Sequence, residues 1–274
     1  MTKEAEIFKL NNQFDYQKLN MKDFNNFPLL SGIYSFRLKQ IIFNLICIKN
    51  DDASVVKNFW QGNYDKLTLT QWLKITQKEG IYFDIGSHTG LFTIIGLLSN
   101  PKNFLISIEP NFINLGRMRS NLRLNNLFKN NSQFLGAASN YSGEGYFSNH
   151  FDNTLMSKGG HIASSGEKIN VIKLDDITIR DNREIKGIKI DTEGEDFKVL
   201  LGAENIIKKF KPEIIIEVRE KNKLKIFEFL SQYNYKTLLI SDKSITKAIP
   251  IELSNLQITS TASVNIYATV HNNI

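Results

Sequence analysis

The sequence predicts an α/β fold in which a mostly parallel, seven-stranded sheet carries helices on both faces. Two observations support this fold class. From residue 80 onward, short apolar runs alternate with longer amphipathic segments. A glycine-containing turn joins the first apolar run to the first amphipathic segment. Because parallel neighbours need a helix-length crossover between them, this alternation is typical of a parallel sheet.

Seven apolar runs are predicted as strands of this sheet. They are Ile81–Ile85, Phe104–Ile108, Gln133–Ala138, Lys186–Ile190, Glu213–Val218, Tyr235–Ile240 and Ser263–Val270. Helices are predicted between them, at 89–99, 111–126, 195–210 and 221–232. Pro212 ends the third helix, because proline cannot continue one. Residues 139–169 are rich in Gly, Ser and Asn and are predicted to form a mobile loop.

The residues before this alternation have a different pattern. Residues 1–30 are polar and are predicted to be helical or irregular, and residues 36–48 to form a strand or hairpin. Residues 52–78 carry apolar side chains at the spacing of one helix face. We therefore divide the chain into an N-terminal cap, residues 1–78, and a main α/β domain, residues 79–274.

The composition is that of a globular protein of 274 residues, with 42% apolar and 23% charged residues. The net charge is +6, but the lysines are scattered, so no nucleic-acid partner is expected. No signal peptide is visible, and the longest early apolar stretch, Ile41–Ile48, is too short to span a bilayer. The single cysteine, Cys47, fits a reducing compartment. We expect a cytoplasmic protein without membrane insertion, of undetermined oligomeric state, with Cys47, Trp60 and Trp72 in its core.

The sharpest motif is the turn after the first predicted strand, Asp84–Gly90. Glycines at 86 and 90 allow a tight turn and close approach of a ligand, and the following helix offers free N–H groups. The dinucleotide pattern G-x-G-x-x-G fails at His88 and Leu91, and no P-loop is present. An acid before the first glycine suits a cationic ligand, such as the sulfonium and amino groups of S-adenosylmethionine. The predicted cofactor residues of this turn are Asp84, Gly86, Ser87, His88, Thr89 and Gly90.

A second acid, Glu109, ends the second predicted strand. In Rossmann-like sheets an acid at this position accepts hydrogen bonds from the ribose hydroxyls of a nucleoside. Pro110 and Asn111 follow Glu109, and Ala137 lies near the end of the third predicted strand. We assign these four residues to the same cofactor site.

Several blocks of the sequence resemble the FkbM-type methyltransferases. FDIGSHTG is similar to the family's D-x-G-x-N-x-G loop, and IEPN, followed by Asn121 and Asn125, is similar to its E-P-N block. The family's later blocks are similar to LDD at 174–176, KIDTEGED at 189–196, LLGA at 200–203 and PEIIIEV at 212–218. Two departures are His88, where the family usually has Asn, and Asp196, where it usually has Glu. The likeness covers roughly residues 80–220.

The resemblance implies a Rossmann-like class I methyltransferase fold, S-adenosylmethionine as cofactor and, usually, O-methylation. The family's substrates include sugars, lipid-linked glycans and polyketide-type secondary metabolites. We therefore expect methylation of a hydroxyl on a sugar, glycan or secondary metabolite. Two alternatives stay open, an N-methyltransferase acting on a nucleic acid or small amine and a non-catalytic nucleoside-binding module.

The candidate catalytic residues follow the strand at 186–190. Asp191 is predicted to position or deprotonate the acceptor, Glu193 to assist, and Lys189 to pair with Asp191 or contact the acceptor. The alternative roles are structural, with Asp191 orienting the loop and Glu193 favouring the helix start. Asp175 could support the crevice, and His150 or His161 could act as a base. Asp191, Glu193 and Asp196 could bind a divalent cation, but acids at a helix start are commonly structural, so no metal is assigned.

Overall fold

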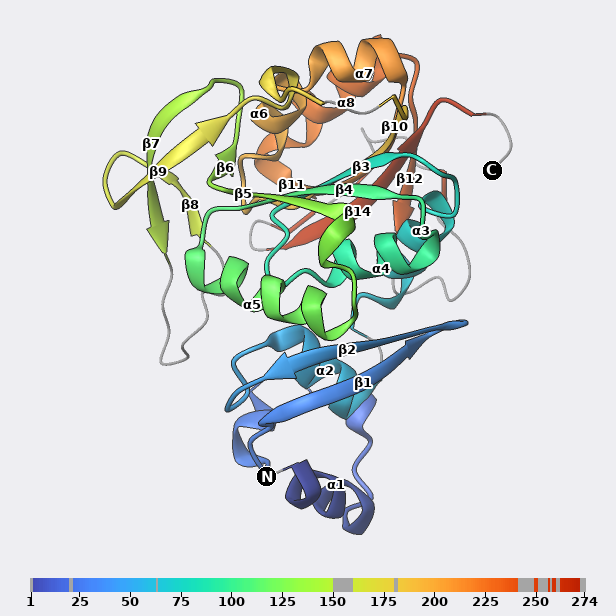
Figure 1. Ribbon diagram of the computed structural model, residues 1–274, viewed down its shortest axis with the longest axis vertical. Coiled ribbons are helices and arrows are strands. Elements are labelled where there is room, and N and C mark those ends of the chain that lie inside the picture. Colours follow the sequence, from blue (N-terminus) through green and yellow to red (C-terminus); the bar gives the residue numbers. More distant parts are fainter. Residues whose placement is uncertain are drawn as a thin grey trace.

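The computed structural model describes residues 2–19, 22–62, 64–149, 160–179, 182–240, 249–250, 256, 258–259 and 262–271. Its main sheet has the strand order β13-β12-β14-β11-β10-β3-β4-β5 (Figure 1). The strands are β13 (Ile249–Pro250), β12 (Lys236–Ile240), β14 (Ser263–Thr269), β11 (Glu213–Arg219), β10 (Ile185–Ile190), β3 (Ile81–Ile85), β4 (Phe104–Glu109) and β5 (Asn131–Leu135). All seven predicted strands are present, and the two-residue β13 extends the sheet to eight.

The sheet is mostly parallel, as predicted. Five neighbouring strands, β11, β10, β3, β4 and β5, run parallel. Strand β14 is antiparallel to both of its neighbours, β11 and β12. All five residues of β3 are buried, which is typical of a parallel strand covered on both faces. From β3 the chain continues to β4 on one side, and it later returns to β10 on the other. Ligands of such sheets bind at this switch point, beyond the carboxyl ends of the strands.

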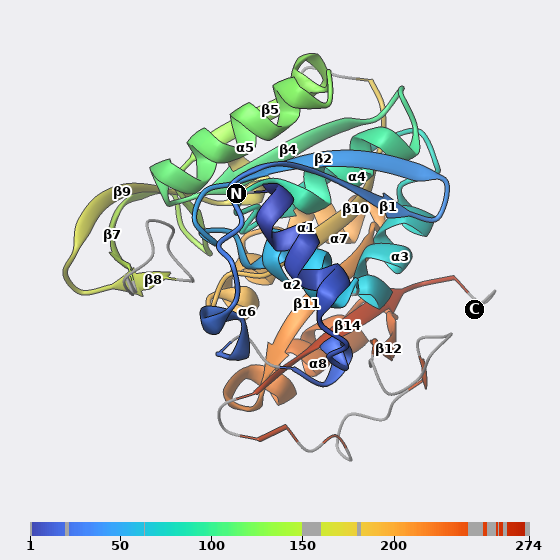
Figure 2. The same cartoon turned by 90° about the horizontal axis from the view of Figure 1, so that it is seen from below.

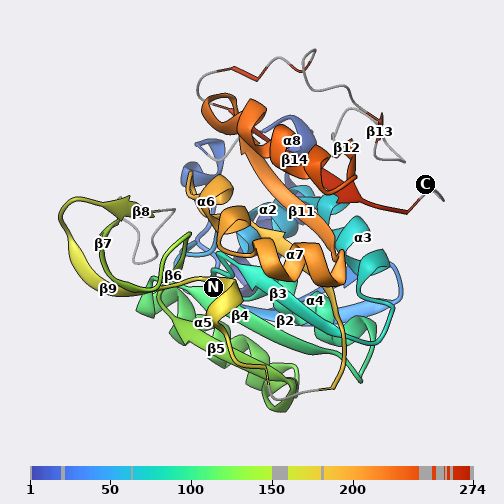
Figure 3. The same cartoon turned by 90° about the horizontal axis from the view of Figure 1, so that it is seen from above.

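Helices cover both faces of the sheet. On one face lie α3 (Lys66–Ile75), α4 (Leu91–Ser99) and α5 (Phe112–Leu124), and on the other α6 (Asp196–Leu201), α7 (Glu204–Phe210) and α8 (Lys223–Gln232) (Figures 1 and 3). Each face buries its own apolar cluster. The two layers confirm the predicted architecture.

The predicted helix at 195–210 is two helices, because the chain breaks at Gly202 and Ala203. A Cβ at Gly202 would lie 2.1 Å from the carbonyl oxygen of Ser139, so a neighbouring segment passes directly against this point. The Asp175 carboxylate then accepts hydrogen bonds at 3.0 Å from the backbone N–H groups of Asn205 and Ile206, which begins α7 anew. Asp175 therefore caps a helix and does not line the crevice.

The prediction of a mobile loop at 139–169 is wrong for the residues described there. They form β7 (Gly143–Asn149), β8 (Gly160–Ala163) and the start of β9 (Glu167–Ile172), which join β6 (Ala137–Ala138) in a second sheet of order β6-β9-β7-β8. The glycines serve close packing, since a Cβ at Gly160 would lie 2.3 Å from the Phe147 ring. The third predicted strand, 133–138, is correspondingly divided between β5 and β6.

The N-terminal segment consists of small elements around an aromatic core. They are α1 (Thr2–Asn11), η1 (Tyr16–Lys18), η2 (Asp23–Asn26), the antiparallel hairpin β1 (Gly32–Leu38) and β2 (Ile41–Cys47), and α2 (Ala53–Gln61). Phe8, Tyr16, Phe24, Phe27 and Phe59 surround Trp60. Trp60, Trp72 and Cys47 are all buried, which confirms them as core residues.

Helix α5 lies against strand β2 of the hairpin (Figures 1 and 2). The Asn121 Oδ1 accepts from Ile46 N at 3.0 Å, and its Nδ2 donates to Thr89 O at 2.9 Å. Asn125 exchanges two hydrogen bonds with the backbone of Asn44, at 2.8 and 2.7 Å. These two amides therefore occupy the hydrogen-bonding edge of β2 and connect it to the turn after β3.

Candidate active site

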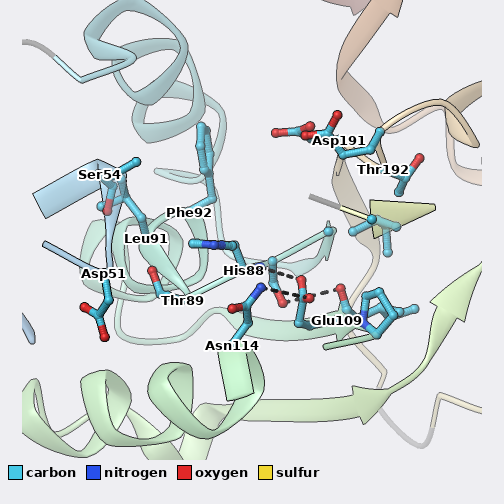
Figure 4. A pocket seen from close by; sticks show the side chains of 18 of the residues that line it. Asp51, Ser54, His88, Thr89, Leu91, Phe92, Glu109, Asn114, Asp191 and Thr192 are labelled. Carbon is cyan, nitrogen blue, oxygen red and sulfur yellow. Dashed lines mark hydrogen bonds between the residues drawn. The ribbon is translucent and has the colours of Figure 1, made fainter. Parts of the chain in front are cut away.

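A cavity of about 540 Å³ opens at the carboxyl ends of β3, β4 and β10 and continues to the N-terminal segment (Figure 4). This volume is within the roughly 300–1,000 Å³ typical of small-molecule sites. Ten of the thirteen predicted site residues line it, namely Gly86, Ser87, His88, Thr89, Glu109, Pro110, Ala137, Lys189, Asp191 and Glu193. Asp84, Gly90 and Asn111 do not.

The turn after β3 depends on its glycines for protein packing. Gly86 has φ +72°, and a Cβ there would lie 1.8 Å from the Asp191 carbonyl oxygen. Gly90 has φ +88°, and its Cβ would meet the Met118 side chain of α5 at 2.5 Å. The sequence predicted that these glycines let a ligand approach closely. In the structure they let other parts of the protein approach, so that the loop after β10 packs against the turn after β3.

Glu109 faces the cavity and is held by three donors. Its Oε2 accepts from His88 N at 2.8 Å, and its Oε1 from Asn111 N at 3.0 Å and Asn114 Nδ2 at 3.3 Å. Burial raises the pKa of the Glu109 carboxyl, although His88 and these donors oppose the shift. The side chain of Asn111 instead caps α5 through the N–H groups of Ile113 and Asn114. The arrangement fixes the Glu109 carboxylate rigidly at the cavity wall.

Asp84 ends β3 just before the turn and is not among the residues that line the cavity. Its side chain is fully buried, and Oδ2 accepts a hydrogen bond from Thr93 Oγ1 of α4 at 2.6 Å. Oδ1 makes no hydrogen bond and lies 3.7 Å from the Lys189 ammonium. Burial raises the pKa of Asp84, and the positive charge of Lys189 opposes that shift. The Asp84 carboxylate thus connects the end of β3 to α4 through Thr93 and to β10 through Lys189.

Lys189 joins the two acids at the strand tips. Its ammonium lies 3.3 Å from Asp191 Oδ2, 3.7 Å from Asp84 Oδ1 and 3.2 Å from the carbonyl oxygen of Gly86. Burial would lower the pKa of Lys189, but the two carboxylates outweigh it and raise that pKa to about 12. Lys189 is thus a permanent cation, while Asp191, 40% exposed, presents its carboxylate to the cavity.

Glu193 belongs to a charged cluster that sequence reasoning missed. Its Oε2 pairs with Arg219, whose Nε donates to Glu217 Oε2 at 3.1 Å. Burial, and next the charge of Asp191, raises the pKa of Glu217 to about 7. Glu217 lies in the apolar block PEIIIEV and Arg219 directly follows that block, where the strand pattern concealed the role of both side chains. Glu193 therefore has a fixed partner, unlike a freely available base.

Asp196 organises the loop that carries Asp191. Its Oδ1 accepts from Thr192 N and Oγ1 at 2.9 and 3.0 Å, and its Oδ2 from Gly194 N at 3.1 Å. His161 lines the cavity, whereas His150 lies outside the described residues. Within the described part of the chain, no group of three or more His, Cys, Asp or Glu side chains is arranged to hold a metal ion.

The N-terminal segment supplies a wall of the cavity that the motifs did not reveal. Residues of η2, the loop after it, α2 and the loop before α3 line it, among them Phe24, Leu29, Ser54, Lys57 and Tyr64. The Asp52 carboxylate, fully buried, caps α2 through Ser54 N and Val55 N and accepts from Thr89 Oγ1 at 2.7 Å. In the sequence, Asp52 could be assigned only as a helix-capping residue. Its contact with Thr89 could not be predicted, because the two residues lie 37 positions apart.

The topology and the cavity define a Rossmann-like α/β protein with a small-molecule site at its switch point. A family model described as the methyltransferase FkbM domain matches residues 84–237, more than half of the chain. The chain therefore belongs to the FkbM methyltransferase family.

The solved structures to which this chain is similar include methyltransferases. A methyltransferase FkbM from Methylobacillus flagellatus is 22% identical with a TM-score of 0.47, and the match covers 69% of this chain and 43% of that one. This chain thus corresponds to less than half of that structure's length. M. jannaschii TYW2, in complex with AdoMet, is 15% identical with a TM-score of 0.45, covering 87% of this chain and 86% of that one. No curated protein matched the sequence. No helix in the described ranges is long and apolar enough to cross a membrane.

Proposed function

We propose that this protein transfers a methyl group from S-adenosylmethionine to a hydroxyl of a sugar, glycan or secondary metabolite. One observation carries the proposal: Glu109 at the tip of β4 and Asp191 just after β10 face the same cavity, with the Gly86 turn between them. The cofactor would supply an electrophilic methyl group on a sulfonium. The residues around Glu109 and Asp191 would then bind the cofactor and orient the acceptor.

The β4 end of the cavity fits a nucleoside. Glu109 is a carboxylate, and each oxygen of such a group can accept about two hydrogen bonds. The three donors that hold it leave acceptor capacity for a ribose hydroxyl. Pro110 and Ala137 line the same region with little polar surface, as the base of a nucleoside requires. We assign Glu109 to the ribose on this basis.

The β10 end suits a hydroxyl acceptor. Asp191 can accept a hydrogen bond from the alcohol and take its proton as the oxygen becomes acidic during transfer. The ammonium of Lys189 pairs with the Asp191 carboxylate at 3.3 Å and so fixes the direction of that side chain. We therefore assign Lys189 as a positioning residue. Glu193, held by Arg219, supports the loop in the same way.

Calorimetry tests the cofactor assignment. Glu109→Gln keeps the shape of the side chain but removes the negative charge, and we expect S-adenosylmethionine to bind at least ~10-fold more weakly, since hydrogen bonds to charged groups contribute about 1.5–3 kcal/mol. Glu228→Gln on the exposed face of α8 is the matched control and should bind normally. Unchanged affinity in Glu109→Gln would remove the ribose assignment.

Methyl transfer is tested with a cell extract of the source organism and S-adenosylmethionine carrying a labelled methyl group. The expected product is an extract compound that gains one methyl group on oxygen. Labelling of a nitrogen instead would establish the N-methyltransferase alternative. Cofactor binding with no labelled product would favour a non-catalytic module.

A further inference from the structure

Tyr64 enters the cavity from the loop between α2 and α3. Its backbone N–H donates to Asn58 Oδ1 at 3.3 Å, which ties the loop to α2. The next residue, Asp65, begins α3 with φ +44° and lies 3.5 Å from Asn265 of β14. The loop is therefore anchored on both sides, so the position of the Tyr64 ring is set by the fold.

The hydroxyl of Tyr64 has no hydrogen-bond partner among the described residues. Two buried tyrosines do have partners, since the hydroxyl of Tyr82 donates to Lys78 O at 2.6 Å and that of Tyr235 to Pro212 O at 2.7 Å. Tyr64 is only half-buried and lines the cavity, so its hydroxyl is free to donate a hydrogen bond to a molecule bound there.

The surroundings of Tyr64 make it a donor. Burial raises the pKa of its phenol, and the charges of Asp65, Asp191, Asp52 and Glu193 raise it further. The hydroxyl therefore stays protonated and cannot serve as a base. Lys57 lies over the ring with its ammonium 5.6 Å from the centroid, an arrangement that also stabilises the ring's position.

A hydroxyl donor, Tyr64, and a carboxylate acceptor, Asp191, thus line one cavity. We propose that Tyr64 binds the methyl acceptor, donating a hydrogen bond to the oxygen next to the hydroxyl that Asp191 holds. Two neighbouring oxygens recognised in this way are those of a vicinal diol, as in a sugar ring. The inference rests on the proposed methyl transfer and names the acceptor class for that same site.

The test uses the full chain, tritiated S-adenosylmethionine and a fixed polar cell extract, diluted in steps so that the acceptor becomes limiting. At high dilution the initial rate is proportional to kcat/KM, so the acceptor need not be identified. For Tyr64→Phe we expect this rate to fall about 3- to 10-fold, the size of one neutral hydrogen bond. The deficit should shrink in concentrated extract, and the cofactor Kd should stay unchanged. Tyr146→Phe, exposed on β7, is the matched control.

The outcomes separate the two proposals. Absence of labelling by the wild-type protein would refute the methyl transfer itself, and Tyr64 would lose its assigned partner with it. Labelling by the wild type with an equal rate in Tyr64→Phe would overturn only the role of Tyr64, as would a parallel loss of cofactor affinity. Pretreating the extract with periodate, which cleaves vicinal diols, should abolish its acceptor activity. An extract that remains fully active after this treatment would overturn the diol assignment.

Discussion

Replacing Lys189 with methionine would leave a buried carboxylate without its compensating charge. Asp84 is fully buried, its Oδ1 makes no hydrogen bond, and in the described chain Lys189 is the one cation within 4 Å of it. Removing one partner of a buried pair typically costs about 3–5 kcal/mol, because the remaining ion stays desolvated. We expect Lys189→Met to lose stability by about this amount. At ~2–4 °C per kcal/mol, the melting temperature should fall by roughly 6–20 °C.

The pH dependence of this loss has a definite sign. Without Lys189, the pKa of Asp84 should rise further above its unfolded value, because burial is no longer opposed by that charge. The folded variant then binds more protons than the unfolded chain, so its stability increases as the pH falls. The gap to the wild type should therefore narrow on acidification. Thermal melts of the wild type and of Lys189→Met at a series of pH values measure this gap.

A second substitution isolates the cause. Asp84→Asn removes the buried charge, so the double variant Asp84→Asn with Lys189→Met should be more stable than Lys189→Met alone. The matched control is Lys198→Met, whose exposed ion pair with Glu195 should contribute at most about 1 kcal/mol. A melting temperature of Lys189→Met within 2 °C of the wild type, or no recovery in the double variant, would refute the reasoning.

Three further outcomes are expected. Gly86→Ala places a Cβ 1.8 Å from the Asp191 carbonyl oxygen at φ +72°, so calorimetry should show at least ~10-fold weaker cofactor binding. The control is Gly116→Ala, in open space on α5, which should leave the free energy of unfolding unchanged or raise it by up to about 1 kcal/mol. Thr89→Val removes the hydrogen bond to Asp52, and urea unfolding should show a loss of about 1.5–3 kcal/mol; a midpoint equal to that of the wild type would contradict a stabilising role for this contact. The pKa of Glu217 is raised to about 7, so as the pH falls the folded protein binds this proton before the unfolded chain does. The stability of the wild type relative to Glu217→Gln should therefore decrease from pH 5 to pH 8. A difference in melting temperature that does not change with pH would exclude this titration.

The sequence by itself determined the elements and the motif at the switch point. The strand at 81–85 and the helices after 89 and 111 were predictable because hydrophobic periodicity and glycine turns are local properties. Gly86 and Glu109 were assigned to one site because consecutive parallel strands end at the same edge of a sheet. The buried state of Trp60, Trp72 and Cys47 followed from their apolar neighbours.

Only the tertiary structure decided what depends on partners distant in the sequence. Gly-rich residues read as a loop became strands, because Phe147 packs against Gly160 on a neighbouring strand. Asp84 does not line the cavity, because one of its carboxylate oxygens accepts from Thr93 and the other lies beside Lys189. Tyr64 lines the cavity from the N-terminal segment, and its neighbour Asp65 contacts Asn265, 200 residues further along the chain. Such side-chain directions are set by burial and charge balance in three dimensions, and a linear pattern carries no signal for them.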